Sequence, residues 1–565
     1  MSDLPDTLEQ LTARLALLEQ RVAALEHTSA ASPAEQTHTA MSEADAGLSF
    51  AQAGGAFSVL GRAMLGIAGA YLLRAVAESS SLPKLAIAAV AIVYAILWLV
   101  AAARVEAGNW LRSTVYAGTS ALILAPMLWE LTLSFKVLPA TATAAILAVF
   151  VATASALAWK QNRTPIFWVA YGSASSAAIA LSIATHELLP FIATLLLMAL
   201  LCESAAVRKL ELSVRPLVAM AADVAIWALI FVYSGQQSTR EDYPLIGVAG
   251  LLAPGCVLFL IYAAAIVIRT AVLGLKITVF ETGQALIAIV LAAASLLYFV
   301  PQAGVMVLGV ACLILAAACY AAAFALFDDG ADERNHRVFS SWAAALLLAG
   351  SMFCLPQTLS AVCLGGTAII AIILGARFNR LILQLHGVVF LLAAAIQSAQ
   401  LKNAFDALAG SPPATLVWGA AAISVCAIVC YVAARPAASE SGGQRLLRLA
   451  MAAMAVWAVA ALVVQGLLWL AAMRMLTEAC HVAFFRTLGA CALALALAFA
   501  GSHWRRVELT RIAYAVVALV AVKLVFEDMR HGRLEFIAAS IFLFAITLIA
   551  VPRLARAGQR MQASA

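Results

Sequence analysis

The chain has 565 residues, of which 64% are hydrophobic and only 11% are charged. A soluble globular domain usually has about 25% charged residues, so this composition excludes a soluble protein and predicts an all-α membrane protein with many spans. The formal net charge is +6, but Lys and Arg are scattered singly between apolar runs, which argues against a surface that binds nucleic acid.

Metal, cofactor and enzyme signatures are missing from the sequence. The ten cysteines lie mostly inside apolar runs and form no Cys-x-x-Cys pair, so we interpret them as small buried residues. The eight histidines never stand at ligand spacing, and no zinc-protease, nucleophile-elbow, P-loop or dinucleotide motif occurs. We therefore predict no metal, no cofactor and no catalytic residue, and the sequence gives no reason to expect an enzyme.

Residues 1–27 carry a heptad pattern. Apolar residues alternate at spacings of four and three through Leu4, Leu8, Leu11, Leu15, Leu18, Val22 and Leu25. This spacing is typical of a coiled-coil seam, and Arg14 stands five residues before Glu19, as in the interchain pairs of a parallel coil. An amphipathic helix on the bilayer surface is the alternative, but its polar face would be acidic. We predict a cytoplasmic coiled coil that associates with a second copy or with another coiled-coil protein.

Residues 28–55 are small and polar and indicate a flexible linker. A transmembrane domain, 56–555, and a cytoplasmic tail, 556–565, follow. The domain holds about 18 apolar runs near the 20 residues that cross a bilayer, although re-entrant pieces such as 474–486 would change the count. The runs are 57–77, 85–103, 114–135, 138–159, 164–185, 188–206, 215–234, 246–268, 278–299, 304–326, 338–356, 359–376, 382–401, 416–434, 447–471, 479–501, 509–527 and 534–552.

The basic residues alternate between the loops of this arrangement. Loops after even-numbered runs, together with the C-terminus, hold 22 of the 35 Lys and Arg residues, and loops after odd-numbered runs hold 8. Cytoplasmic loops of membrane proteins are enriched in Lys and Arg. We therefore expect a multi-pass protein with both termini in the cytoplasm.

The stretch from Phe57 to Glu78, which holds the first run, contains charged residues that need an explanation. Residues four apart lie above one another on a helix, and here they form a stripe of Arg62, Gly66, Ala70, Arg74 and Glu78. Because a charge inside a membrane is costly, we expect this stripe to face protein. If Arg62 and Glu78 extend to opposite interfaces, only Arg74 needs a partner.

Further charged residues stand near the predicted outer ends of other runs. Together they predict an intramembrane polar cluster of Arg74, Glu78, Glu130, Arg486, Lys523, Glu527 and Asp528. Asp223 lies near the midplane of its run and is a possible separate site. The cluster is either an outward-facing polar cavity or a set of buried ion pairs that fasten helices together, and the sequence leaves both interpretations open.

Arg74 is the cation of the first run that we expect to be deep enough to require a counter-charge. Its neighbour Glu78 follows it in the weaker order for a pair within one helix, which favours a partner on another helix. The acids at the same level are Glu130, Glu527 and Asp528. We predict that the first and seventeenth runs are neighbours, with Lys523 in the same cluster.

Three sequence features carry a resemblance to a known family. They are the leucine heptads before the first span, Gly61-Arg62 with Gly69-Ala70-Tyr71-Leu72-Leu73-Arg74-Ala75, and Val522-Lys523-Leu524-Val525-Phe526-Glu527-Asp528 before the last span. With these the chain resembles bacterial many-spanning predicted membrane proteins that are defined by a domain of unknown function. A single Asp followed by Leu would be expected where this chain has Glu527-Asp528. The resemblance implies a location in the bacterial inner membrane and supplies no activity.

The loops between the runs are too short for a soluble domain, so the function belongs in or at the lipid bilayer. We expect a transporter or a flippase-like protein for a polar or lipid-linked component of the cell envelope, because charges inside membranes commonly mark transport pathways. The alternative is a non-catalytic membrane scaffold that acts through its cytoplasmic coiled coil.

Overall fold

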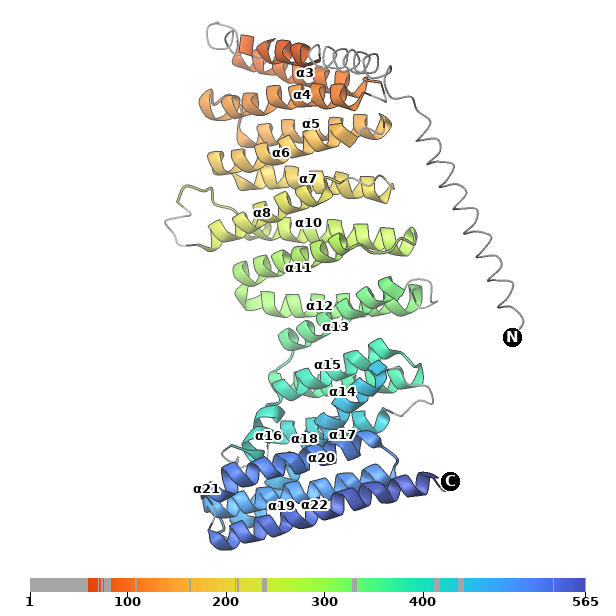
Figure 1. Ribbon diagram of the computed structural model, residues 1–565. Coiled ribbons are helices and arrows are strands. Elements are labelled where there is room, and N and C mark those ends of the chain that lie inside the picture. Colours follow the sequence, from red (N-terminus) through yellow and green to blue (C-terminus); the bar gives the residue numbers. More distant parts are fainter. Residues whose placement is uncertain are drawn as a thin grey trace, which may run out of the picture. The chain divides into compact units, whose positions relative to one another are not determined.

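The computed structural model describes residues 59–69, 71–72, 75, 83–106, 109–161, 164–208, 210, 213–235, 241–327, 333–410, 417–434, 442–531 and 533–563. The described residues are mostly helical and include no strand, so the predicted all-α class is confirmed (Figure 1). The predicted coiled-coil seam, residues 4–25, and the linker 28–55 lie outside this part of the chain.

Fourteen helices of the described part are long and apolar enough to cross a membrane. Each of them overlaps one of the runs predicted from the sequence. A helix suits a bilayer because it satisfies its own backbone hydrogen bonds, which lipid cannot do. The architecture is therefore that of an all-helical protein with many helices suited to a membrane.

Other predicted runs are not confirmed as single spans. The run 57–77 is described only in part, with a short helix at Val59–Gly69. The run 114–135 overlaps α4 (Trp110–Trp129), whose hydroxyl residues and Arg112 reduce its apolar character. The run 416–434 corresponds to α17 (Trp418–Ala433), which is about 24 Å long and thus shorter than a hydrocarbon core of about 30 Å.

The run 382–401 is broken. α15 (Leu381–Gln397) is followed by the short helix α16 (Gln400–Leu408), which leaves at an angle of 68°. Between them Ala399 adopts a left-handed φ of 56°, which is unusual for a residue with a Cβ atom. The sequence instead suggested a re-entrant piece at 474–486, where the structure has a turn followed by the start of α19 (Ala479–His503).

The chain packs as two units. The first comprises Met1–Ala225 and Glu241–Pro244, and small hydroxyl side chains bring its helices close together. Ser113 on α4 donates a hydrogen bond to the Ala102 carbonyl at 3.0 Å, and Ser120 donates one to the Ala95 carbonyl at 2.6 Å. The unit contains α3 (Lys84–Ala103), α4, the π-helical turn η1 (Glu130–Ser134), α5 (Ala140–Gln161), α6 (Thr164–Thr185), α7 (Leu188–Val207) and part of α8 (Arg215–Ser234).

The second unit comprises Ile226–Arg240 and Leu245–Ala565. Its helices pack mainly on those that precede and follow them in the chain. Besides α15 to α17 and α19, it contains α10 (Val248–Val267), η2 (Ile268–Val272), α11 (Val279–Phe299), α12 (Pro301–Leu326), α13 (Glu333–Cys354), α14 (Gln357–Arg377), α18 (Gly442–Met473), α20 (Val507–Lys523), η3 (Leu524–Asp528), α21 (Met529–His531) and α22 (Leu534–Ala563).

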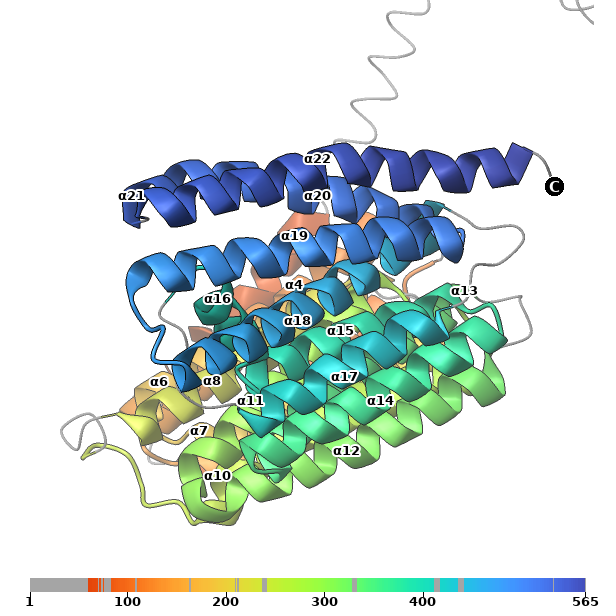
Figure 2. The ribbon, with the colours of Figure 1, turned by 90° about the horizontal axis from the view of Figure 1, so that it is seen from below.

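One core cluster of the second unit is formed mainly by α14, α15, α17, α18, α19 and α20. It is built from buried side chains such as Leu364, Ile372, Leu391, Met451 and Leu497. α19 lies beside α20 and α22, while α16 packs on α17 and α18 (Figures 1 and 2). This packing fixes the end of the short helix α16 close to the first turns of α19.

Candidate functional site

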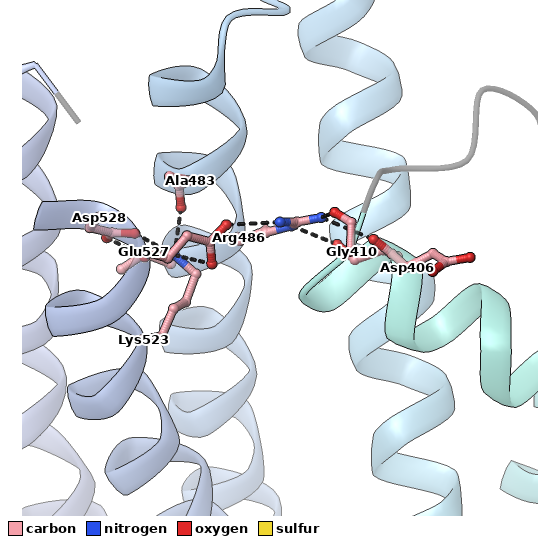
Figure 3. Close-up of polar contacts among 9 residues, drawn as sticks. Asp406, Gly410, Ala483, Arg486, Lys523, Glu527 and Asp528 are labelled. Atoms are coloured by element: carbon pink, nitrogen blue, oxygen red, sulfur yellow. Dashed lines mark hydrogen bonds and ion pairs between the residues drawn. The ribbon is translucent and has the colours of Figure 1, made fainter. Parts of the chain in front are cut away.

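Arg486, on the second turn of α19, is the centre of a buried charged cluster (Figure 3). Its side chain is 5% exposed. Nε donates a hydrogen bond to the Ala407 carbonyl at 2.8 Å, and Nη2 donates to the carbonyls of Asp406 at 2.9 Å and of Gly410. Nη1 pairs with Oε1 of Glu527 at 2.8 Å.

The carbonyls that Arg486 binds belong to the last turn of α16 and to Gly410, two residues after it. The last carbonyls of a helix have no partner within the helix and carry the negative end of its dipole. A guanidinium has a planar set of five donors and can therefore satisfy several carbonyls and a carboxylate together. Arg486 thus binds both the end of α16 and the carboxylate of Glu527 with one side chain.

Lys523 forms the second half of the cluster. Its Nζ donates to the Ala483 carbonyl at 2.9 Å and pairs with Asp528 (Figure 3). It also donates to Thr487 Oγ1 at 2.8 Å. Thr487 in turn donates to Oδ2 of Asp528 at 2.7 Å. A lysine has three donors, so Lys523 has a partner for each of them.

The π-helical turn η3 explains why both adjacent acids reach cations. In a regular α-helix with about 3.6 residues per turn, a residue five positions after Lys523 would point away from it. The wider turn of a π-helix rotates that residue back, and such turns are common at functional sites. Glu527 therefore pairs with Arg486, while Asp528, which is buried, pairs with Lys523.

Uncharged polar groups line the break between α15 and α16. A cavity of about 10 Å³, roughly the size that holds one water molecule, is lined by Gln400, Asn403, Ser424 and Gln465 among others. The amide nitrogen of Asn403 is buried and has no hydrogen-bond partner among the described residues. Gln400 also lines an adjoining, mostly apolar cavity of about 250 Å³. The break therefore places neutral hydrogen-bonding groups next to apolar space.

Of the residues of the predicted cluster, the structure brings Arg486, Lys523, Glu527 and Asp528 together. Arg74 and Glu78 lie outside the described residues, so the predicted partner of Arg74 and the pairing of the first and seventeenth runs stay predictions.

Glu130 and Asp223 do not belong to the second unit. Glu130 is half-buried at the start of η1, and Asp223 is half-buried on α8.

In the first predicted run, Gly66 packs against Trp98, while Arg62 is exposed and lies 3.5 Å from the Tyr116 hydroxyl. The glycine of the predicted stripe thus faces protein, whereas Arg62 lies at the surface.

Three buried ion pairs at other helix ends were missed by sequence reasoning. Arg215 binds Glu203 through two hydrogen bonds of 3.0 and 2.7 Å, and Arg269 pairs with Glu281 at 2.9 Å. In both pairs the partners are twelve residues apart across a short turn. This spacing of opposite charges between two consecutive apolar runs could have predicted both pairs from the sequence. The third pair joins Arg448 to Glu508 at 3.0 Å.

One group of possible metal ligands occurs among the described residues. Donor atoms of Glu478, Cys480 and His481 lie within 4.8 Å of one another at the start of α19. Glu478 is exposed and pairs with Arg533 at 2.9 Å. The carboxylate of this group therefore already has a cationic partner.

Comparison with known proteins found no family model, no curated protein and no solved structure that matches the chain.

Proposed function

We propose that the protein transports a polar or lipid-linked component of the cell envelope across the bacterial inner membrane. The observation that supports this most is the broken helix α15–α16, whose short arm ends on a buried arginine. Transporters commonly place discontinuous helices at their substrate sites, because the free backbone groups at a break can bind polar cargo. Buried charges within membrane helices are also typical of transport pathways.

The Arg486 cluster would act as a clamp on α16. Arg486 divides its donors between the carbonyls at the end of α16 and Glu527, so α16 can move away from α19 and η3 only if Arg486 loses or exchanges partners. An element with two alternative sets of contacts is what a switching step requires. The cluster has two cations and two anions, so such an exchange would not leave a net charge in the membrane.

The neutral groups at the break favour a cargo with a polar, uncharged part. Gln400, Asn403, Ser424 and Gln465 offer amides and hydroxyls that suit hydroxyl or amide groups. The adjoining apolar cavity, which Gln400 also lines, suits an apolar part of the same molecule.

For topology we propose 18 spans with both termini in the cytoplasm. The fourteen long helices would supply fourteen of these spans. The other four would be the first run, α4, the bent pair α15–α16 and α17. The alternating distribution of basic residues supports this orientation. Reporter domains active only outside the cytoplasm should be silent after residues 30 and 555, and an active C-terminal fusion would contradict the orientation.

The function can be tested in proteoliposomes that contain fluorescent phosphatidylglycerol in both leaflets. Dithionite quenches only the outer leaflet, so further quenching measures movement between leaflets. We expect the wild-type protein to accelerate movement over empty liposomes, and Arg486→Gln to abolish it. Arg533→Gln, which removes a 67% exposed arginine from its pair with Glu478, is the matched control and should behave as wild type. No acceleration by the wild-type protein would overturn the proposal.

The heptad pattern of residues 4–25 supports a second candidate function, a membrane scaffold that clusters partners through a coiled coil. A Cys at position 2 should crosslink two copies, and Leu11→Asp with Leu18→Asp should abolish that crosslink. Deletion of residues 1–50 separates the two functions: lipid movement survives the deletion in a transporter, whereas a scaffold loses its activity.

A further inference from the structure

A cavity of about 580 Å³ lies within the second unit between α12, α13, α14 and α15. We call it the α12–α15 cavity. Its walls are mostly apolar, with Phe324, Leu347 and Phe390 among them, and its polar groups come from Tyr320, Thr367 and Arg380. This volume lies within the range of about 300–1,000 Å³ that is usual for small-molecule sites. None of its lining residues belongs to the Arg486 cluster.

The cavity lies at a seam between two helix pairs. α13 contacts α12 extensively but meets α14 and α15 over a much smaller surface. Across the seam the Tyr320 hydroxyl of α12 lies 3.3 Å from Nδ1 of His386 on α15. The two pairs are therefore joined by a polar contact at the side of an apolar space.

The cavity opens along one face of α14. Ile370, Leu374 and Phe378 line it and are spaced four residues apart, so they lie on one stripe of the helix. They are 58%, 39% and 62% exposed, respectively. Apolar side chains exposed along a helix suited to a membrane are expected to meet lipid, so the opening faces the hydrocarbon core.

The depth of the cavity corresponds to one leaflet. The α14 segment from Thr367 to Phe378 is about 16 Å long at 1.5 Å per residue. A hydrocarbon core of about 30 Å gives each leaflet about half that thickness. Arg380 lies at the end of this segment, in the turn after Arg377 that the distribution of basic residues assigns to the cytoplasmic side. The cavity thus has a cation at the level of lipid headgroups and apolar walls below it.

We propose that the α12–α15 cavity binds a phosphate-headed lipid of the cytoplasmic leaflet, with one apolar chain between α12 and α14 and the headgroup at Arg380. A guanidinium binds phosphate through charge-assisted hydrogen bonds, which gives the site a preference for an anionic headgroup. The inference rests on the proposed transport function and specifies its substrate class as a lipid that enters from the cytoplasmic side.

The test uses the full-length protein in phosphatidylcholine nanodiscs that contain phosphatidylglycerol with a diazirine near the end of one acyl chain. After irradiation, labelled peptides are identified by mass spectrometry. We expect the labels to concentrate on α12, α13 and α14 around Leu347 and Thr367. Leu374→Trp, which fills the cavity, and Arg380→Gln, which removes the cation, should each lower this labelling several-fold.

Val362→Trp is the matched control, because it places the same bulk on an exposed position of α14 outside the cavity. It should leave the labelling unchanged, and size-exclusion profiles identify any variant that does not fold. A phosphatidylcholine probe with the same diazirine should label the cavity more weakly. Labelling spread evenly over the exposed helices, or unchanged in both Leu374→Trp and Arg380→Gln, would overturn the inference.

The labelling does not require transport, so the two proposals can fail separately. Labelling of the cavity in a wild-type protein that moves no lipid would overturn the proposed function alone. Lipid movement without labelling of the cavity would overturn the lipid site alone.

Discussion

Arg269 and Arg486 are equally buried, each about 5% exposed, yet they connect very different parts of the second unit. Arg269 pairs with Glu281 twelve residues later, across the turn between η2 and α11. Arg486 reaches Glu527 in η3 and the carbonyls at the end of α16, which are 41 and at least 76 residues away. Burial of a charge therefore does not by itself distinguish a functional site from a structural one.

The contacts around Arg269 indicate that it stabilises a single turn between consecutive helices. Glu281 also closes a capping box with Thr278 at the start of α11. Asn335 holds the same turn, since its side chain accepts from the Ile277 backbone at 2.9 Å and donates to the Leu275 carbonyl at 3.0 Å. This pair fixes one hairpin, whereas the Arg486 cluster joins three elements that are distant in the chain. Only the second arrangement can respond to a movement of α16.

The largest effect is expected for Arg486→Ala. The change leaves three buried carbonyls without their Arg486 donor and removes the closer of the two cations that pair with Glu527, which together typically costs about 3–5 kcal/mol. Unfolding by sodium dodecyl sulfate in mixed micelles, followed by circular dichroism, measures this free energy. Arg533→Ala breaks an exposed pair and should cost less than about 1 kcal/mol. Equal stability of the two variants would show that the cluster is not a clamp.

Thr487→Val should have an intermediate effect. The hydroxyl of Thr487 donates to Asp528 and accepts from Lys523, and hydrogen bonds to charged groups contribute about 1.5–3 kcal/mol. The same unfolding assay measures the loss. Thr153→Val is the control, because Thr153 is half-buried and its hydroxyl forms an exposed hydrogen bond within its own helix, to the Val149 carbonyl. It should change the stability by less than about 0.5 kcal/mol.

Replacement of both members of the local pair should have a smaller effect. Arg269→Met with Glu281→Gln removes two charges together, and Gln can keep the capping interaction with Thr278. Exchange of a complete buried pair for residues of similar volume is often neutral, so we expect a change within about 1 kcal/mol. If this double variant lost as much free energy of unfolding as Arg486→Ala, the Arg269–Glu281 pair and the Arg486 cluster would not differ in role.

The smallest effect on the free energy of unfolding is expected for a change at the break between α15 and α16. Ala399→Gly removes a Cβ atom from a left-handed position, and the relief of about 1–2 kcal/mol is partly offset by about 0.5–1 kcal/mol of added backbone entropy in the unfolded chain. We expect a gain of about 1 kcal/mol or less. Clear destabilisation would mean that Ala399 does not adopt this conformation and that α15 and α16 are not separated here.

The sequence predicts the long helices well because a run of about 20 apolar residues has few other stable structures. It does not predict the break at Ala399, since the segment Gln397-Ser398-Ala399-Gln400 contains no Gly or Pro to mark a turn. The left-handed residue is imposed by tertiary packing. The length of α17 was also not predicted correctly, because the apolar run 416–434 is longer than the helix that forms.

The candidate site was predictable in part for a similar reason. Lys523 and Glu527 are four residues apart, so the pattern shows that they share a face, and the neighbouring Asp528 needs the π-helical turn to join them. The carbonyls of α16 left no sequence signal, because every residue has a carbonyl. Their contact with Arg486 depends on how α16 and α19 pack.

The most direct measurement compares lipid movement in proteoliposomes by the wild-type protein, by Arg486→Gln and by the double variant Arg269→Met with Glu281→Gln. All three proteins must first elute as single folded species, so that activity and not recovery is compared. We expect the double variant to move fluorescent phosphatidylglycerol at the wild-type rate and Arg486→Gln to move none above empty liposomes. Equal rates for the two variants would contradict the role of the Arg486 cluster as the clamp on α16.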